Sequence, residues 1–314
     1  MNFPPELLKQ CWFLSGPTAV GKTRIALRLA KRLDAEILSL DSMAIYRGMA
    51  IGTAKPDKHE RALVPHHLID LADPAQEFSV TEYVSAALEA VEDVIDRGHV
   101  PLFVGGTGLY LKAILRGIFD GPPANWDLRR QLEEQSRKSG AQQLHDQLVA
   151  VDPWTARRLH VNDQRRIIRA LEVHAATGIP LSQLHHNVVR PSSDRPAAVV
   201  WLEPPREWLR ARIDQRVDRM MEQGLLQETQ NLLSARQAPG RTARQALGYR
   251  ELIAHLEADC PLGESVELIK VRTRQFAKRQ HTWFRNMEEC ESMTVSGEES
   301  AEQLADQLFH RIRQ

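Results

Sequence analysis

The sequence predicts an α/β fold in which helices cover a parallel sheet and a helical insertion interrupts it. Three observations lead to this prediction. A glycine-rich turn of the form G-x-x-x-x-G-K-[ST] lies between an apolar segment and an amphipathic segment. Strand and helix patterns alternate through the first 120 residues, which is typical of a doubly wound parallel sheet. Only helical patterns follow from residue 121 to residue 190, before a strand pattern returns at 197–202.

The glycine-rich turn comprises residues 16–23. Apolar residues 11–15 before it predict a strand, and residues 24–33 after it carry apolar side chains at helical spacing. The N–H groups of such a turn and the positive end of the helix dipole cradle a chain of phosphates. Lys22 adds a charge, and the Thr23 hydroxyl can hold Mg²⁺. The motif predicts a P-loop NTPase-like core with Mg²⁺ as cofactor and these phosphate-binding residues: Gly16, Pro17, Thr18, Ala19, Val20, Gly21, Lys22 and Thr23.

Two further strand patterns end in polar residues. Residues 35–40 are followed by Asp41 and Ser42, and residues 100–104 are followed by the glycine-flanked Thr107. Ligands of doubly wound sheets bind beyond the carboxyl ends of the strands. We therefore expect Asp41, Thr107 and the glycine-rich turn to share one site.

Other segments predict the rest of the architecture. Ser79 and Glu82 form a capping box at the start of a helix over residues 79–97. Composition changes at Asp120–Pro123, so we predict that residues 1–120 and 191–314 form the catalytic core and that residues 121–190 form a helical insertion domain. Within the insertion a helix begins at Asp163. The core continues after the strand at 197–202 with helices at 205–223 and 263–285.

The bulk composition excludes several classes of protein. Hydrophobic residues make up 42% of the chain, yet no run approaches the ~20 apolar residues of a membrane span. The N-terminus lacks a basic region followed by an apolar stretch. Cys11, Cys260 and Cys290 are isolated and predict neither a disulfide framework nor a zinc site. We therefore expect a cytoplasmic protein without a membrane partner, and we expect it to be a monomer.

Charge is concentrated in one segment. The chain carries 41 basic and 41 acidic residues, a net charge of zero. Residues 270–285, the basic segment, contain six basic and no acidic residues, so the remainder of the chain sums to −6. Such a segment can hold a polyanion locally. Within the predicted helix the spacing places Phe276, Gln280 and Trp283 in a packing stripe, with Lys270, Arg274 and Lys278 on another face.

The longest motifs resemble those of bacterial tRNA dimethylallyltransferases. The stretch D-S-x-x-I-Y-x-x-M-x-I-G-T-A-K-P is much more specific than the glycine-rich turn, and the similarity reaches almost to the C-terminus. The resemblance implies transfer of a dimethylallyl group from dimethylallyl diphosphate to the exocyclic amine of the adenosine just 3′ of the anticodon, with the tRNA anticodon stem-loop as partner. It is carried by residues 16–23, 41–56, 66–70, 104–110, 247–250 and 278–283.

The implied reaction explains the residue types in the predicted site. A departing diphosphate gains charge, which loop N–H groups, Lys22 and Mg²⁺ at Thr23 can stabilise. A carboxylate can take the proton from the attacking amine. The position of Asp41 at a strand end fits two roles, that of this proton-accepting base and that of a magnesium-binding aspartate. The resemblance favours the role of base. Thr107 can bond a base or a phosphate, or can simply form a tight turn. Arg216 on the helix at 205–223 approaches the diphosphate or forms a surface ion pair.

The resemblance also implies a set of RNA contacts. An arginine run at 165–169 is more often a solvated helix face, but its match to a tRNA-contact segment favours RNA. Lys278, Arg279 and Arg285 are expected to face phosphates, and the insertion domain is expected to close over the anticodon loop. The predicted tRNA-binding residues are Asp41, Ser42, Met43, Ala44, Thr107, Arg129, Arg165, Arg166, Ile167, Ile168, Arg169, Gln245, Gly248, Tyr249, Arg250, Lys278, Arg279, Gln280, Trp283 and Arg285.

Two other functions fit part of the sequence. A small-molecule or nucleoside kinase shares the glycine-rich turn and Mg²⁺, but has no use for the basic segment. A nucleotide-switched binding protein would carry an N-K-x-D guanine signature, which is absent from the sequence. Adjacent His66 and His67 suit a turn better than a metal site, because neighbouring side chains of a strand point to opposite faces.

Overall fold

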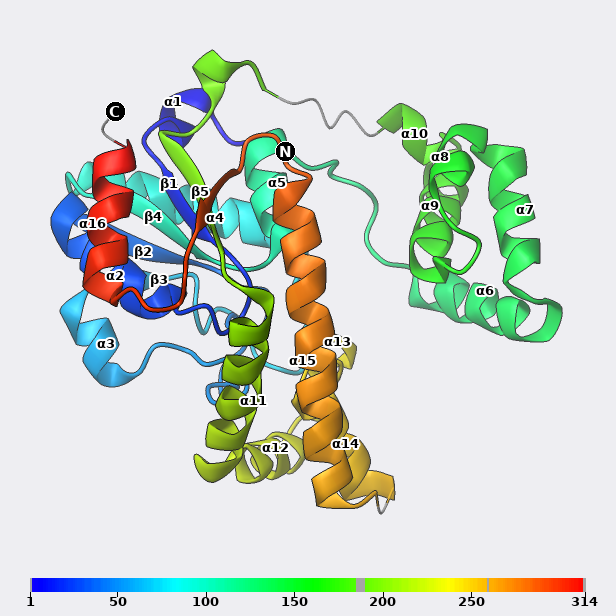
Figure 1. Ribbon diagram of the computed structural model, residues 1–314. Coiled ribbons are helices and arrows are strands. Elements are labelled where there is room, and N and C mark those ends of the chain that lie inside the picture. Colours follow the sequence, from blue (N-terminus) through cyan, green and yellow to red (C-terminus); the bar gives the residue numbers. More distant parts are fainter. Residues whose placement is uncertain (1, 185–189, 259, 313–314) are drawn as a thin grey trace. The chain divides into compact units, whose positions relative to one another are not determined.

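A computed structural model describes residues 2–184, 190–258 and 260–312. The chain divides into two compact units. Phe3–Leu115 and Arg190–Gln314 form one of them, here called the sheet unit, and Arg116–Val189 form the other, here called the insertion unit (Figure 1). The sheet unit is therefore assembled from two separate lengths of chain.

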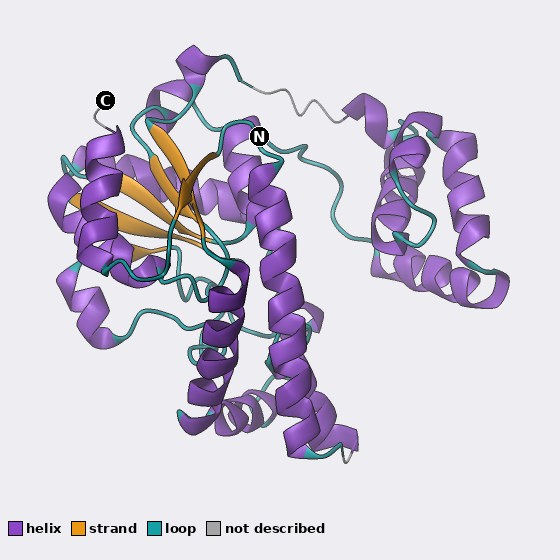
Figure 2. Ribbon diagram, viewed as in Figure 1, coloured by secondary structure: helices purple, strands orange, loops and turns teal. Residues whose placement is uncertain are grey.

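The sheet unit is built on a parallel sheet. Its strand order in the described residues is β3-β2-β4-β1-β5-β6, and every neighbouring pair is parallel. Figure 2 shows helices on both sides of this sheet. The predicted α/β fold with a parallel core is thus confirmed. The strands are β1 (Trp12–Ser15), β2 (Ala35–Leu40), β3 (His66–His67), β4 (Val100–Gly105), β5 (Ala198–Glu203) and β6 (Glu291–Thr294).

Alternation along the strands divides the core between the two faces of the sheet. Leu14 and Val200 pack against α2 (Lys22–Leu33) and α16 (Ala301–Ile312) in one apolar cluster. The neighbouring residue Phe13 points to the other face, where its ring stacks on Phe103 with 4.7 Å between centroids. Burial on both faces explains why the central strands are almost continuously apolar.

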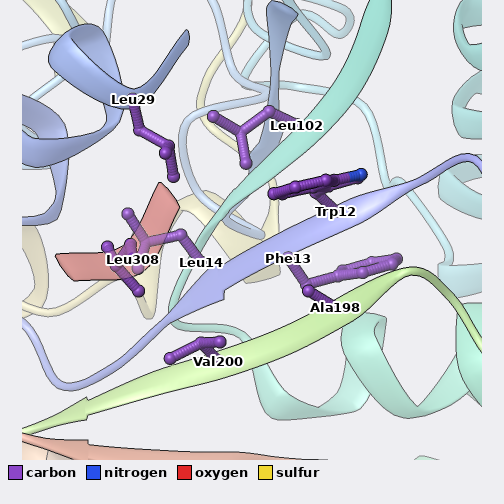
Figure 3. A pocket seen from close by; sticks show the side chains of 8 residues that line it. All are labelled: Trp12, Phe13, Leu14, Leu29, Leu102, Ala198, Val200 and Leu308. Carbon is purple, nitrogen blue, oxygen red and sulfur yellow. The ribbon is translucent and has the colours of Figure 1, made fainter. Parts of the chain in front are cut away.

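A small void remains in this core. Figure 3 shows the eight side chains around it, from β1, β4, β5, α2 and α16. Its volume is about 10 Å³ and its lining is apolar, which leaves at most the space of one water molecule and no partners for it. The void is a packing defect, and it is not a ligand site.

Further helices complete the sheet unit. One layer packs α11, α12, α14 and α15 around a second apolar cluster that also holds Tyr46 and Met49 from the loop after β2. Its long helix α15 lies beside α11 in Figure 1. The remaining bounds are α1 (Pro5–Leu8), α3 (Lys58–Leu63), α4 (Val80–Asp96), α5 (Gly108–Arg116), the 3₁₀ turn Ser192–Asp194, α11 (Arg206–Glu222), α12 (Leu225–Leu233), α13 (Arg241–Arg244), α14 (Tyr249–Ala258) and α15 (Leu262–Arg285).

The described part of the insertion unit is helical, as predicted for residues 121–190. Its apolar core includes Leu144, Leu148 and Ile167. Glu172, 1% exposed, accepts hydrogen bonds from Arg129, Arg169 and the backbone N–H of Asn125. Burial opposes ionisation of Glu172, but the bonds from the two arginines outweigh it and lower its pKa. The helices are α6 (Trp126–Ser139), α7 (Ala141–Val151), α8 (Pro153–Arg158), α9 (Gln164–Thr177) and α10 (Leu181–Leu184).

The structure corrects two expectations and adds one strand. His66 and His67 form the short edge strand β3, where a turn was predicted, because their backbone pairs with Ile37 and Leu38. Phe276, predicted to pack, is 36% exposed, and Ala277 is buried in its place. The pairing of β6 at the far edge was not predicted. None of the helices in the described part of the chain is both long and apolar enough to cross a membrane.

Replacing Glu172 by alanine should destabilise the insertion unit. The variant leaves two arginines and the N–H of Asn125 without their carboxylate, a loss of about 2 kcal/mol in local unfolding free energy. Native-state hydrogen exchange of α6 and α9 measures it. The control is Glu134→Ala, which removes an exposed pair with Lys138 and should cost less than about 0.5 kcal/mol. Equal protection in the two variants would contradict the role assigned to Glu172.

Candidate active site

Three neighbouring strands end at one edge of the sheet. β4 pairs with β2 on one side and with β1 on the other. The loops that follow β1, β4 and β2 therefore lie next to one another. They are named here the phosphate loop (residues 16–23), the Thr107 loop (residues 105–108) and the Asp41 segment (residues 41–44). The structure thus brings the three predicted strand-end groups together.

The phosphate loop runs directly into a helix. Gly21 caps α2 with a φ of 107°, a conformation that favours glycine. Lys22 is the first residue of α2, and its Nζ donates to the carbonyl oxygens of Gly16 and Pro17, both at 2.8 Å. The unpaired N–H groups at the start of this helix therefore face the loop, as anion binding requires.

Two half-buried cations, Lys22 and Arg216, lie at the phosphate loop. Burial, together with the neighbouring Arg216, lowers the pKa of Lys22 to about 7, while Asp41 acts in the opposite direction. Burial also lowers the pKa of Arg216, with Asp41 again opposing the change. Lys22, Arg216 and Asp41 are thus within electrostatic range of one another. Arg216 is half-buried and lies near Lys22 and Asp41, which favours its predicted approach to the diphosphate over a surface ion pair.

Arg212 also belongs to this cluster, although it was not predicted. Its Nε donates to the carbonyl oxygen of Ala19 at 2.9 Å, and its guanidinium lies 4.6 Å from the centre of the Trp208 ring. Ala19 has a positive φ of 66°, which is uncommon for a residue other than glycine. Arg212 therefore supports the loop at a residue with an unfavourable backbone conformation. Arg212 lies four residues before Arg216 on the predicted helix, and this spacing places both on one face.

A network of hydrogen bonds orients the Asp41 segment. Asp41 Oδ1 accepts the N–H groups of Met43 at 2.8 Å and Ala44 at 3.2 Å. The N–H of Ser42 donates to Thr107 Oγ1 at 3.1 Å. Because Thr107 accepts this bond, its own hydroxyl hydrogen remains available to a ligand. The carboxyl group and the hydroxyl are therefore held side by side.

The part of the long motif at residues 41–56 that follows Asp41 has a structural role. The Glu228 carboxylate accepts the N–H groups of Ala50, Ile51 and Gly52 and the hydroxyl of Tyr249. Lys55 Nζ donates to the Tyr46 carbonyl oxygen and to Asp70. These bonds hold the loop after β2 against the helical layer. Much of the motif therefore supports the site from outside it.

The predicted RNA-binding residues of the sheet unit fall into two groups. Ala44, Gly248 and Tyr249 are buried, with Ala44 and Gly248 bonded through their N–H groups and Tyr249 through its hydroxyl. The side chains of Ala44 and Tyr249 lie in the core and Gly248 has no side chain, so a side-chain contact of these residues with RNA is not expected. The residues at or near the surface are Ser42, Met43, Gln245, Arg250, Lys278, Arg279, Trp283 and Arg285.

The basic segment is likewise divided. Lys270 pairs with Asp218 at 2.8 Å and Arg274 with Asp214 at 2.6 Å, so the first half of the segment binds acidic side chains of α11. Arg272 pairs with Glu251. Only the second half, with Lys278, Arg279 and Arg285, presents exposed positive charge.

The predicted arginines of the insertion unit are divided in the same way. Arg129 and Arg169 bind the buried Glu172, and Ile167 and Ile168 lie in the apolar core. Arg165 and Arg166 are exposed, and Arg166 lies 3.5 Å from Asp163. The RNA prediction for this helix therefore rests on the two exposed arginines.

The donor set suits Mg²⁺ held largely by a ligand. Among residues 2–184, 190–258 and 260–312, no group of three or more His, Cys, Asp or Glu side chains is arranged to hold a metal ion. Thr23 offers a hard hydroxyl oxygen in the first turn of α2, next to the phosphate loop. Mg²⁺ commonly takes one or two protein oxygens and completes its shell with phosphate oxygens and water.

The known proteins that are similar to this chain include tRNA dimethylallyltransferases. The chain is 45% identical over 295 residues to the tRNA dimethylallyltransferase of Desulforudis audaxviator, covering 94% of each protein. It is 46% identical over 274 residues to that of Geobacter metallireducens, covering 87% of this chain and 88% of the relative.

Solved structures agree with these sequence similarities. A tRNA isopentenylpyrophosphate transferase from Bacillus halodurans aligns over 97% of both chains, with a TM-score of 0.70 and 36% identity. A eukaryotic dimethylallyltransferase acting on tRNA aligns over 95% of this chain and 77% of its own, with a TM-score of 0.76 and 28% identity. The IPP transferase (IPPT) profile matches residues 44–287, and the chain belongs to this family.

Proposed function

We propose that this enzyme transfers a dimethylallyl group from dimethylallyl diphosphate to the exocyclic amine of the adenosine just 3′ of the anticodon in tRNA, and releases diphosphate. Beyond membership of the family, one observation on the site supports this reaction most directly. The half-buried cations Lys22 of the phosphate loop and Arg216 of α11 lie within electrostatic range of Asp41, a carboxylate at a neighbouring strand end. A site for a leaving diphosphate is thus paired with a group that accepts a proton.

The phosphate loop stabilises the leaving group. As the carbon–oxygen bond breaks, negative charge accumulates on the diphosphate, where Lys22, Arg216 and the first N–H groups of α2 can stabilise it. Thr23 would hold Mg²⁺, which neutralises diphosphate charge when bound. No phosphoryl group moves in this reaction, so the loop binds a product that departs intact.

Asp41 and Thr107 serve the acceptor. An aromatic amine becomes cationic when it attacks carbon, and a carboxylate within reach removes the proton. The two backbone bonds to Oδ1 fix the Asp41 carboxyl plane without using Oδ2. Thr107, which accepts from Ser42, can donate its hydroxyl hydrogen to the substrate. We assign the base to Asp41 and acceptor positioning to Thr107.

Exposed cations mark the RNA-binding surfaces. Lys278, Arg279 and Arg285 belong to the sheet unit, and Arg165 and Arg166 belong to the insertion unit. Such side chains bind phosphates without reading sequence, so they position the anticodon stem-loop. A loop adenosine leaves its stack at lower cost than a paired base, which suits a buried reaction site. We propose action by a cytoplasmic monomer.

The first experiment measures transfer directly. Purified protein and Mg²⁺ are incubated with unmodified tRNA and radiolabelled dimethylallyl diphosphate, and label is counted in precipitated RNA. We expect label that disappears when EDTA is added or when the adenosine 3′ of the anticodon is replaced. Unlabelled RNA, with ATP consumed when small metabolites are supplied, would instead identify a kinase.

Asp41→Asn should remove the base while keeping an oxygen for the two backbone bonds. We expect kcat to fall by about 100-fold or more, with tRNA affinity changed by less than about threefold. Single-turnover transfer and filter binding measure the two quantities. Asp34→Asn is the control, because Asp34 precedes β2 and its side chain is 84% exposed. A fully active Asp41→Asn enzyme would exclude the role of base.

Dimethylallyl diphosphate binding should depend on the charge of Lys22. A bound diphosphate group is negatively charged, so it favours the ammonium form of Lys22 and raises a pKa that is about 7 in the free protein. Above pH 7 binding therefore takes up a proton, and affinity falls as pH rises, by at most about tenfold per pH unit. Calorimetry between pH 7 and 9 without tRNA, in buffers of different ionisation enthalpy, measures both effects.

The matched variants for this measurement lie on one helix. Lys22→Met should bind more weakly and lose the proton uptake. Lys31→Met, which changes an exposed lysine of α2, should keep both the affinity and the uptake. Unchanged proton uptake in Lys22→Met would show that another group titrates.

A further inference from the structure

Helix α15 places the Gln280 side chain between two loops of the active site. Gln280 is only 5% exposed. Its Oε1 accepts the N–H of Thr18 in the phosphate loop at 2.9 Å, and its Nε2 donates to the carbonyl oxygen of Gly106 at 2.9 Å. A carboxamide can accept on one side and donate on the other, whereas an ionised carboxylate can only accept.

The close approach of α15 requires the glycines of the Thr107 loop. A Cβ on Gly106 would lie 2.1 Å from Gln280 Nε2, and a Cβ on Gly108 would lie 2.8 Å from the Trp283 ring. Gln280 and Trp283 are three residues apart on one helical face. Two glycines of the loop thus make room for two side chains of α15.

The hydrogen bonds continue beyond Gly106. The next residue, Thr107, accepts the N–H of Ser42, which adjoins Asp41. A continuous set of contacts therefore runs from Thr18 through Gln280 and the Thr107 loop to the Asp41 segment. Regular strand pairing ends at Gly105, which is paired with Ser15 and Leu40, and the N–H groups of Gly106 and Thr107 donate to the Leu40 carbonyl oxygen. Beyond these bonds, Gln280 connects the Thr107 loop to Thr18 of the phosphate loop.

We propose that Gln280 is a positioning residue that fixes the phosphate loop relative to the Thr107 loop, and so aligns the leaving diphosphate with the acceptor groups. The inference rests on the proposed transfer reaction. Transfer requires the allylic carbon, the amine and the base in one narrow geometry, and small displacements of such groups reduce rates strongly. Gln280 acts through backbone groups and does not touch the reacting atoms.

The resemblance to tRNA dimethylallyltransferases assigns Gln280 a different role, that of an RNA contact. Both ends of the carboxamide are engaged within the protein, and the residue is buried. An RNA-contact residue would lose tRNA affinity on substitution, whereas a positioning residue loses kcat. The two roles are therefore separable.

The test compares Gln280→Leu and Gln280→Glu with controls at Gln275. Gln275 is exposed on the same helix, so Gln275→Leu and Gln275→Glu repeat the chemical changes without the two bonds. We expect kcat for transfer to fall about tenfold or more in Gln280→Leu, with tRNA affinity within about threefold of the unmodified enzyme. The Gln275 variants should behave as the unmodified enzyme does.

The pH profile of Gln280→Glu distinguishes alignment from simple loss of stability. An ionised glutamate faces the Gly106 carbonyl oxygen without a hydrogen to donate. A protonated glutamic acid restores both bonds, and burial favours this neutral form. Activity relative to the unmodified enzyme should therefore rise as pH falls from 8 to 6 in Gln280→Glu, and should stay constant in Gln280→Leu.

A measurement without transfer separates this inference from the proposed function. Hydrogen exchange is compared in peptides covering residues 16–23 and 105–108, with and without dimethylallyl diphosphate and Mg²⁺. We expect the ligand to slow exchange in both loops of the unmodified enzyme, but only in residues 16–23 of Gln280→Leu. If the ligand still slows exchange in both loops of Gln280→Leu, the inference is overturned. It is also overturned if Gln280→Leu loses only tRNA affinity and keeps its kcat. Unmodified enzyme that transfers nothing would instead count against the proposed function.

Discussion

The position of β4 between β1 and β2 is the constraint on which the active site depends. The chain forms β1, crosses over through α2 to β2, and returns later to insert β4 between them. Since all three strands are parallel, the loops after them emerge side by side. Groups far apart in sequence, Lys22, Asp41 and Thr107, thereby share one edge of the sheet.

Several residues around the site hold its loops in place and do not react themselves. Glu228 holds the loop after β2 by its N–H groups, and Arg212 holds the phosphate loop through Ala19. Each of these buried or half-buried polar groups is paired, as the cost of leaving such groups unpaired requires. The reacting groups are few, and their geometry is maintained by residues outside the site.

The sequence predicted those helices and strands that are marked by apolar runs or by cap residues within a few positions. The strands that became β1, β2, β4 and β5 and the capping box at Ser79 were predicted because apolar runs and cap residues act over a few positions. The edge strand β3 has only two residues, and β6 is as long as β1 but is mostly polar and buries only Met293, so neither contains an apolar run. Gln280 was placed on an inward face by its spacing, but its partner Thr18 lies 262 positions away, beyond the reach of any local pattern. Likewise, the motif match at 165–169 did not separate Ile167, which packs inward, from Arg165, which faces solvent.

The distance between Thr18 and Gln280 has a consequence for how the enzyme is made. The phosphate loop is synthesised long before the helix that carries its amide partner, because 262 positions separate Thr18 from Gln280. A nascent or truncated chain ending before α15 contains the entire glycine-rich motif and still lacks the contact that aligns it. Assembly of the site therefore waits until α15 has been synthesised, and fragments that end before α15 carry the motif without this geometry.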